Sequence, residues 1–180
     1  MFLNILMAIT TPICNFGEKA KDFSLISTEG SKISLSDIRG EKGTLIMFIC
    51  NHCPYVKSVI SALVADCKYL KTFGINSVAI MSNDVSTYPE DSFENMKLFS
   101  NKHNFTFPYL YDEDQSIAKN YGAVCTPDFF GYNENLELQY RGRIFAARPT
   151  ELSSAMQQIS KTGNGPKTQF PSMGCSIKWK

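Results

Sequence analysis

The residues best suited to chemistry are Cys50 and Cys53, which are separated only by Asn51 and His52. The apolar run at 44–49 (TLIMFI) predicts a buried strand that ends at this dithiol, and a helix is predicted directly after it. Cys50 would then lie at a helix N-terminus, where unpaired N–H groups and the helix dipole favour a thiolate. We expect Cys50, as the more exposed sulfur, to attack a substrate and Cys53 to resolve the mixed disulfide. The motif therefore predicts thiol–disulfide exchange that uses no bound cofactor.

Two other interpretations of the motif stay open. The cysteines could form half of a zinc site whose remaining ligands come from Cys125, Cys175 or His103. The sequence has no second Cys-x-x-Cys and no His-x-His, which counts against zinc. A purely structural role at a strand–helix junction is the other interpretation. His52 favours redox chemistry, because a protonated imidazole between the sulfurs would stabilise a thiolate further.

Three of the other cysteines lie in the body of the chain. Cys67 falls on the apolar face of the helix predicted after the dithiol, so we expect it in the core. Cys125 is expected near the dithiol, either as a third redox partner or as a small apolar residue at a strand end. Cys14 lies in an early loop, and the sequence assigns it no role.

The sixth cysteine, Cys175, lies in the C-terminal segment PSMGCSIKW at 171–179. Trp179 could anchor this tail over the domain. Cys175 would then exchange disulfides with Cys50; the alternative is a surface thiol in a packed tail.

Arg141 and Arg143 alternate on the last predicted strand and would therefore share one face of the sheet. They could bind an anionic substrate or form surface ion pairs. Both interpretations stay open at this point.

The composition is that of an ordinary globular domain: 180 residues, 43% hydrophobic and 19% charged, with a formal net charge of +1. That charge argues against a nucleic-acid partner. No segment approaches the roughly 18 apolar residues of a membrane span. The start, MFLNILMAI, lacks the basic region and cleavage site of a signal peptide. We therefore expect a cytoplasmic protein with an N-terminal extension at 1–16, in which Met1 or Met7 is the true start.

The periodicity predicts an α/β domain at 17–162, followed by a tail at 163–180 that packs on it. The predicted order is β-β-β-α-β-α-β-α-β-β-α, which gives a mixed sheet with helices on both faces. The strands are expected at 22–27, 32–35, 44–49, 77–81, 107–111, 128–132 and 136–140. The helices are expected from about 56 to 74, 89 to 100, 115 to 121 and 149 to 161.

Several segments together resemble the peroxiredoxin-like proteins of the thioredoxin superfamily, in the redoxin/AhpC–TSA group. They are CNHCPYV (50–56), SNDVSTYPED (82–91), FPYLYDEDQSIAKNYGAVCTPDFF (107–130), YRGRI (140–144) and PSMGCSIKW (171–179). The resemblance implies a thioredoxin fold, a three-layer α/β/α structure around a mixed sheet. It implies that Cys50 is the attacking cysteine, that Cys53 is the resolving one, and that Pro127 is a cis-proline beside the dithiol with Thr126 as a substrate-binding neighbour. Cys175 falls in the family's characteristic tail.

The sequence also departs from its relatives. Peroxiredoxins carry Pro-x-x-x-Thr-x-x-Cys, but Ile46 and Cys50 occupy the Pro and Thr positions relative to Cys53, and Gly43 and Met47 occupy them relative to Cys50. Thioredoxin has a Trp before its first cysteine, where this chain has Ile49, and a buried acid that the strand at 44–49 lacks. Phe145 and Ala146 stand where acidic residues are expected.

The leading hypothesis is reversible exchange between the Cys50/Cys53 dithiol and protein or small-molecule thiols and disulfides. A thiol-dependent peroxidase that uses Cys50 with a resolving cysteine is the first alternative. A zinc-binding or redox-sensing module is the second. No nucleic acid, membrane or metal is expected as a partner, and the sequence leaves the oligomeric state open.

Overall fold

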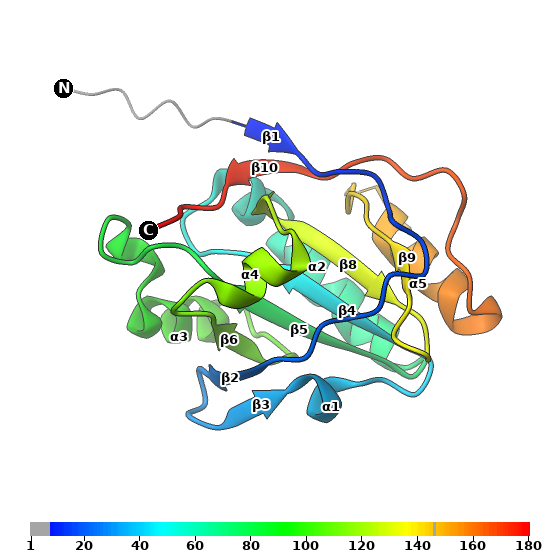
Figure 1. Cartoon of the computed structure of the whole chain (residues 1–180), viewed down its shortest axis with the longest axis horizontal. Coiled ribbons are helices and arrows are strands. Elements are labelled where there is room, and N and C mark those ends of the chain that lie inside the picture. The colour runs from blue at the N-terminus through cyan, green and yellow to red at the C-terminus, as the bar shows by residue number, and fades with distance from the viewer. Residues whose placement is uncertain (1–7, 146) are drawn as a thin grey trace.

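The apolar run before the dithiol forms β4 (Gly43–Phe48), a strand whose every residue is buried. In this computed structural model, which describes residues 8–145 and 147–180, β4 lies inside a seven-stranded sheet (Figure 1). Its neighbours are β5 (Ile75–Met81), which is parallel to it, and β8 (Asp128–Tyr132), which is antiparallel. The strand order is β3 (Lys32–Ser34), β2 (Ser24–Ser27), β6 (Tyr109–Tyr111), β5, β4, β8 and β9 (Leu138–Tyr140).

Helices cover both faces of this sheet. The side chains of alternate residues of β4 enter two different cores, as the pleat requires: Leu45 and Met47 lie in one, and Ile46 and Phe48 in the other. The first core is closed by α2 (Pro54–Lys71), α3 (Phe93–Lys102) and α5 (Glu151–Thr162). The second is closed by α1 (Leu35–Ile38) and α4 (Ser116–Tyr121). The predicted three-layer α/β/α arrangement is confirmed.

A second, smaller sheet joins both ends of the described chain to the loop before β8. Its order is β1 (Ala8–Thr10), β10 (Met173–Ser176) and β7 (Cys125–Thr126), with antiparallel pairing throughout. Figure 1 shows β1 and β10 side by side across one edge of the molecule. The sequence did not predict these strands, because each is only two to four residues long and too short for a visible alternation.

Most predicted elements are present, with local differences. Pro89 starts a separate 3₁₀ turn, η1 (Pro89–Asp91), and α3 begins only after Ser92, whose side chain caps it. β9 begins at Leu138 rather than 136, because Leu136 has a left-handed backbone (φ 56°). The alternative start residues Met1 and Met7, and Ala146, lie outside the described residues. Among the described helices, no stretch is long and apolar enough to cross a membrane.

Candidate active site

The dithiol lies in the short connection between β4 and α2. Cys53, and not Cys50, is the N-cap of α2, and Pro54 is the first helical residue. The expectation that Cys50 sits at the helix N-terminus is therefore wrong. Cys50 lies three residues before the N-cap, and a bend at Asn51 and His52 separates it from the helix. The expected difference in exposure is wrong as well: Cys50 and Cys53 are both 0% exposed.

Cys50 has a surrounding that disfavours a thiolate. Its Sγ lies 3.4 Å from Thr126 Oγ1 and 3.8 Å from His52 Nδ1. Burial raises the pKa of the Cys50 thiol well above its ordinary value, and the nearby charge of Asp91 adds to this. Cys50 is therefore a thiol at neutral pH and can donate a hydrogen bond to a neighbouring thiolate.

Cys53 has the opposite setting. Its Sγ lies 3.2 Å from the Thr126 carbonyl oxygen and 2.7 Å from Cys175 Sγ. Hydrogen bonds from the Cys50 thiol, the Cys175 thiol and the Val56 N–H lower the pKa of Cys53 from 9.0 to about 4, although burial opposes them. The Val56 amide is one of the unpaired N–H groups of the first helical turn. Of the two motif cysteines, Cys53 is therefore the one with the lowered pKa.

His52 forms an ion pair with Asp91 beside the sulfurs. Its Nδ1 lies 2.6 Å from Asp91 Oδ2, and this hydrogen bond raises the pKa of His52 despite partial burial. The imidazole stacks on Tyr88, with ring centroids 5.3 Å apart. His52 Nε2 is buried and has no hydrogen-bond partner among the described residues. The histidine is thus fixed next to the dithiol in a form that favours its protonated state.

Asp91 is a site residue that the sequence prediction missed. Its side chain is 0% exposed, and it accepts hydrogen bonds from the backbone N–H groups of Asn51 (2.8 Å) and His52 (3.3 Å) and from Asn83 Nδ2 (2.9 Å). It therefore holds the bend between the two cysteines from the far side. The sequence around Asp91, an acidic residue just after Pro89, gives no local signal of this contact with the dithiol loop. The contact arises because η1 packs against that loop in the folded protein.

The loop opposite the dithiol is the one predicted from the family resemblance. The peptide bond between Thr126 and Pro127 is cis. Thr126 contacts both reactive sulfurs, through its hydroxyl to Cys50 and through its carbonyl oxygen to Cys53. Sequence reasoning therefore placed the right dipeptide at the site.

The remaining cysteines have separate positions. Cys125 is buried, its thiol lies 3.6 Å from the Pro127 carbonyl oxygen, and burial raises its pKa strongly. Cys67 is in the core as predicted, 3.9 Å from Met47 Sδ, and burial raises its pKa to about 12. Cys14 is half-buried, and its pKa is raised to about 11 by the same cause. None of the three has the donors that lower the pKa of Cys53.

Cys175 is brought to the site, but against Cys53 and not against Cys50. The tail folds back over the domain as expected. Its anchor is Ile177, which is 3% exposed, rather than Trp179, which is 43% exposed. Ile177 N–H also donates to the Val124 carbonyl oxygen at 3.1 Å.

Among the residues named as zinc ligands, Cys175 reaches Cys53 Sγ at 2.7 Å but is not a member of the group with metal-ligand geometry. In the described part of the chain, the group with metal-ligand geometry is Cys50, His52 and Asp91, whose donor atoms lie within 4.8 Å of one another. Within it, His52 Nδ1 is occupied by Asp91. His103 instead caps α3 and packs on Phe99.

The two arginines do not lie on a strand, because β9 ends at Tyr140. Arg141 is buried and reaches Asp128 through Nε (3.3 Å) and Nη2 (3.0 Å), with the Phe130 ring 4.4 Å from its guanidinium carbon. Arg143 pairs with Glu151 nearer the surface. Arg141 is thus a buried structural partner of the residue after Pro127.

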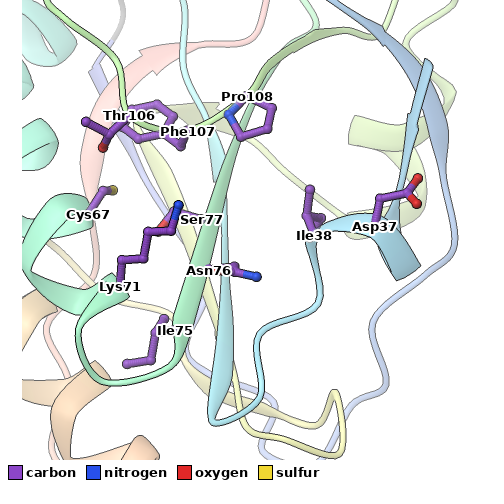
Figure 2. Close-up of a pocket in the computed structure, with 10 residues that line it drawn as sticks. All are labelled: Asp37, Ile38, Cys67, Lys71, Ile75, Asn76, Ser77, Thr106, Phe107 and Pro108. Atoms are coloured by element: carbon purple, nitrogen blue, oxygen red, sulfur yellow. The ribbon is translucent and has the colours of Figure 1, made fainter. Parts of the chain in front are cut away.

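Two hollows help to define the surroundings. An open groove of about 570 Å³ borders Asn51 and is lined in part by Lys57, Glu90 and Leu98. Figure 2 shows a smaller pocket of about 180 Å³ at residues 75–77 and 106–108. It lies where β4 and β5 begin, whereas the dithiol follows the end of β4. Of these two hollows, the groove at Asn51 therefore borders the loop that carries the dithiol, and the smaller pocket lies at the other end of β4.

The comparisons agree with this architecture. The sequence profile described as the AhpC/TSA family matches residues 16–147. A solved structure of an uncharacterized conserved protein from Geobacillus kaustophilus is 41% identical, with a TM-score of 0.91 and 97% of each chain covered. A Coxiella burnetii protein provisionally named peroxiredoxin bcp is 25% identical over 115 residues, 64% of this chain and 71% of that protein. The thiol-disulfide oxidoreductase ResA of Bacillus subtilis is 26% identical over 117 residues, 65% of this chain and 61% of ResA. This chain therefore belongs to the AhpC/TSA family and has the thioredoxin fold.

Proposed function

We propose that this protein is an oxidoreductase that exchanges its Cys50/Cys53 dithiol with the disulfides of proteins or small thiols. The observation that carries the proposal is the setting of the two sulfurs: Cys50 contacts the Thr126 hydroxyl and Cys53 contacts the Thr126 carbonyl oxygen, beside the cis peptide bond before Pro127. The pKa of Cys53 is also lowered by its hydrogen bonds, the first of them from the Cys50 thiol. A thiolate is the nucleophile of disulfide exchange. The relative ResA is named as a thiol-disulfide oxidoreductase, which supports the same chemistry.

The lowered pKa of Cys53 and the raised pKa of Cys50 support Cys53 as the attacking sulfur in the first step. The Cys53 thiolate attacks one sulfur of the substrate disulfide, and the substrate's other sulfur leaves as a thiolate. A second cysteine thiol then loses its proton and attacks the Cys53 sulfur of the mixed disulfide, which releases the substrate's remaining thiolate. The substrate gains two electrons and two protons as one intramolecular disulfide forms. His52, whose pKa is raised by its hydrogen bond to Asp91, favours the negative charge that develops on sulfur when it is protonated.

The test is a disulfide-reductase assay on an unfolded protein disulfide, with an excess of a small dithiol as reductant. Cys53→Ser should abolish turnover, because it removes the nucleophile. Cys14→Ser is the matched control and should retain wild-type turnover, since Cys14 is a half-buried thiol whose neighbours include Arg141 and Gln169. Equal turnover of Cys53→Ser and the wild-type protein would refute the proposal.

A thiol-dependent peroxidase is the second candidate, and the AhpC/TSA match favours it. The same Cys53 thiolate would attack one oxygen of a peroxide and break the O–O bond, so that the other oxygen leaves as an alcohol or water. The resulting sulfenic acid then condenses with a second cysteine thiol into a disulfide, with loss of water. Peroxide consumption coupled to the dithiol, at a rate far above that of protein-disulfide reduction, would favour this candidate. The absence of the peroxiredoxin Pro and Thr positions argues for the exchange reaction.

A further inference from the structure

The C-terminal strand β10 is held in one register against the loop of the dithiol. Cys175 pairs with Thr126, and Ala8 of β1 pairs with Cys175 from the other side. Gly174 permits this approach, since a Cβ at this position would lie 2.0 Å from the Thr126 carbonyl oxygen. Ser172 Oγ donates to the Pro127 carbonyl oxygen at 2.8 Å and fixes the strand's start. The position of Cys175 is therefore set by backbone pairing on both sides.

This register brings Cys175 into contact with the sulfur of Cys53. Cys53 Sγ lies 2.7 Å from Cys175 Sγ. Cys50 Sγ also contacts Thr126 Oγ1 and His52 Nδ1, so Cys53 has a thiol neighbour on either side. Cys175 is 1% exposed, so its thiol faces the site and not the solvent. Two thiols held at this separation need little movement to form a disulfide, which requires about 2.05 Å between the sulfurs.

We propose that Cys53 and Cys175 form a second redox-active disulfide, with Cys175 resolving the mixed disulfide on Cys53 in place of Cys50. This inference rests on the proposed exchange reaction and extends it to a third cysteine. Cys53 is then the sulfur shared by two alternative disulfides, one within the Cys-x-x-Cys motif and one to the tail.

The chemistry balances without any further oxidant. The substrate disulfide oxidises the Cys53 thiolate to a mixed disulfide and loses one thiolate. The Cys175 thiol then gives up its proton to the released substrate thiolate and attacks the Cys53 sulfur, so that the second substrate thiolate leaves and takes a proton from solvent. The sum is one substrate disulfide reduced to two thiols and one Cys53–Cys175 disulfide formed.

The two disulfides can also interconvert. Cys50, left as a free thiol, can attack Cys53 and release Cys175, which moves the disulfide without changing the oxidation state of the protein. The Cys53–Cys175 form links β10 covalently to the start of α2. Cys175 thereby determines whether Cys50 is free to engage a second thiol partner.

The test maps disulfides in the full chain after oxidation with oxidised glutathione, acid quenching, alkylation and peptide mass spectrometry. In Cys50→Ser we expect a Cys53–Cys175 peptide, and in Cys175→Ser only a Cys50–Cys53 peptide. Cys125→Ser is the matched control, a buried neighbour of the same loop that should leave both disulfides detectable. Circular dichroism of each variant establishes that it folds.

The inference is overturned if Cys50→Ser, although folded, carries glutathione on Cys53 and a fully alkylated Cys175. A second measurement needs no substitution: wild-type protein titrated with less than one equivalent of oxidised glutathione should show protection of Cys175 from alkylation. Full alkylation of Cys175 there would also contradict the inference. If the wild-type protein shows no disulfide-reductase turnover, the proposed function itself is refuted. Failure of the Cys53–Cys175 inference and failure of the proposed function are therefore distinguishable.

Discussion

The imidazole of His52 and the carboxylate of Asp91 form a 2.6 Å ion pair in which the carboxylate is completely buried. Asp91 also accepts two backbone N–H groups from the bend between the cysteines. The Asp91 carboxylate therefore has two roles. It fixes the backbone of the Cys-x-x-Cys loop through hydrogen bonds, and it raises the pKa of His52. A buried charge with these contacts loses several partners at once when it is removed.

Asp91→Asn should lower the free energy of unfolding by about 2 kcal/mol, a value below that of a fully buried pair because His52 is partly exposed. The raised pKa of His52 means that its contribution is fully present below the ordinary value of 6.5 and is lost as pH rises through the raised folded value. The destabilisation should therefore be larger at mildly acidic pH than at alkaline pH. Urea unfolding across this range measures it. Glu94→Gln, an exposed acid on α3, is the control and should change little; an equal loss at every pH would contradict the assigned ion pair.

The Cys53 thiolate should persist into acidic solution. The pKa of Cys53 is lowered from 9.0 to about 4. The contribution of this thiolate to the free energy of unfolding is therefore fully present above pH 9.0 and is lost as the pH falls through about 4. The ultraviolet absorbance of the thiolate, taken as wild type minus Cys53→Ser, should show its inflection there. Cys50→Ala should move the inflection upward, because the Cys50 thiol is the largest cause of the lowering. An inflection that stays in place in Cys50→Ala would mean that Cys50 donates nothing to Cys53.

Gly174→Ala should disrupt the contact between the tail and the dithiol loop. The added Cβ would meet the Thr126 carbonyl oxygen at 2.0 Å, so β10 must shift, at a cost of about 1–3 kcal/mol. The variant should also lose the Cys53–Cys175 peptide after oxidation while it keeps the Cys50–Cys53 peptide. Ser176→Ala, which changes the same strand without a clash, should leave both unchanged. Wild-type stability in Gly174→Ala would show that the strand has room to move.

The two arginines should differ in their effect on stability. Arg141→Met leaves the buried Asp128 carboxylate without its partner and should cost about 3–5 kcal/mol. Arg143→Met removes a half-exposed pair with Glu151, which solvent screens, and should cost far less. Denaturant unfolding of the two variants side by side gives the comparison. Equal decreases in the free energy of unfolding would mean that the burial of Arg141 does not increase the contribution of its ion pair to stability.

The sequence could predict whatever depends on neighbouring residues. The buried strand β4, the helix after the dithiol and the strand at 128–132 follow from periodicity over a few residues. The placement of Asp91, Cys175 and Gly174 could not be predicted in this way, because it depends on pairing between segments far apart in the chain. The predicted difference in exposure between Cys50 and Cys53 was wrong for the same reason. Thr126 of β7 contacts both sulfurs, and Cys175 of β10 contacts the sulfur of Cys53.

The family resemblance contributed what periodicity could not. Pro127 is unremarkable in a single sequence, because few X-Pro bonds are cis, and only the fold context places it opposite the dithiol. The resemblance implied that Cys50 is the attacking cysteine, whereas the lowered pKa in the structure is that of Cys53. That depends on Cys53 being the cap of α2, a difference of three residues that is below the accuracy of predicted helix boundaries.

The pairing of β10 with β7 gives the protein an order of assembly during its own synthesis. Cys53 and Cys175 are 122 residues apart, so at ribosomal rates of about 5–20 residues per second roughly 6–24 seconds separate their appearance. Over that interval the nascent chain has its Cys-x-x-Cys motif but not the strand that covers it. The nascent protein therefore presents its dithiol to surrounding oxidants and thiols before the mature site exists, and a segment made 122 residues after Cys53 closes it.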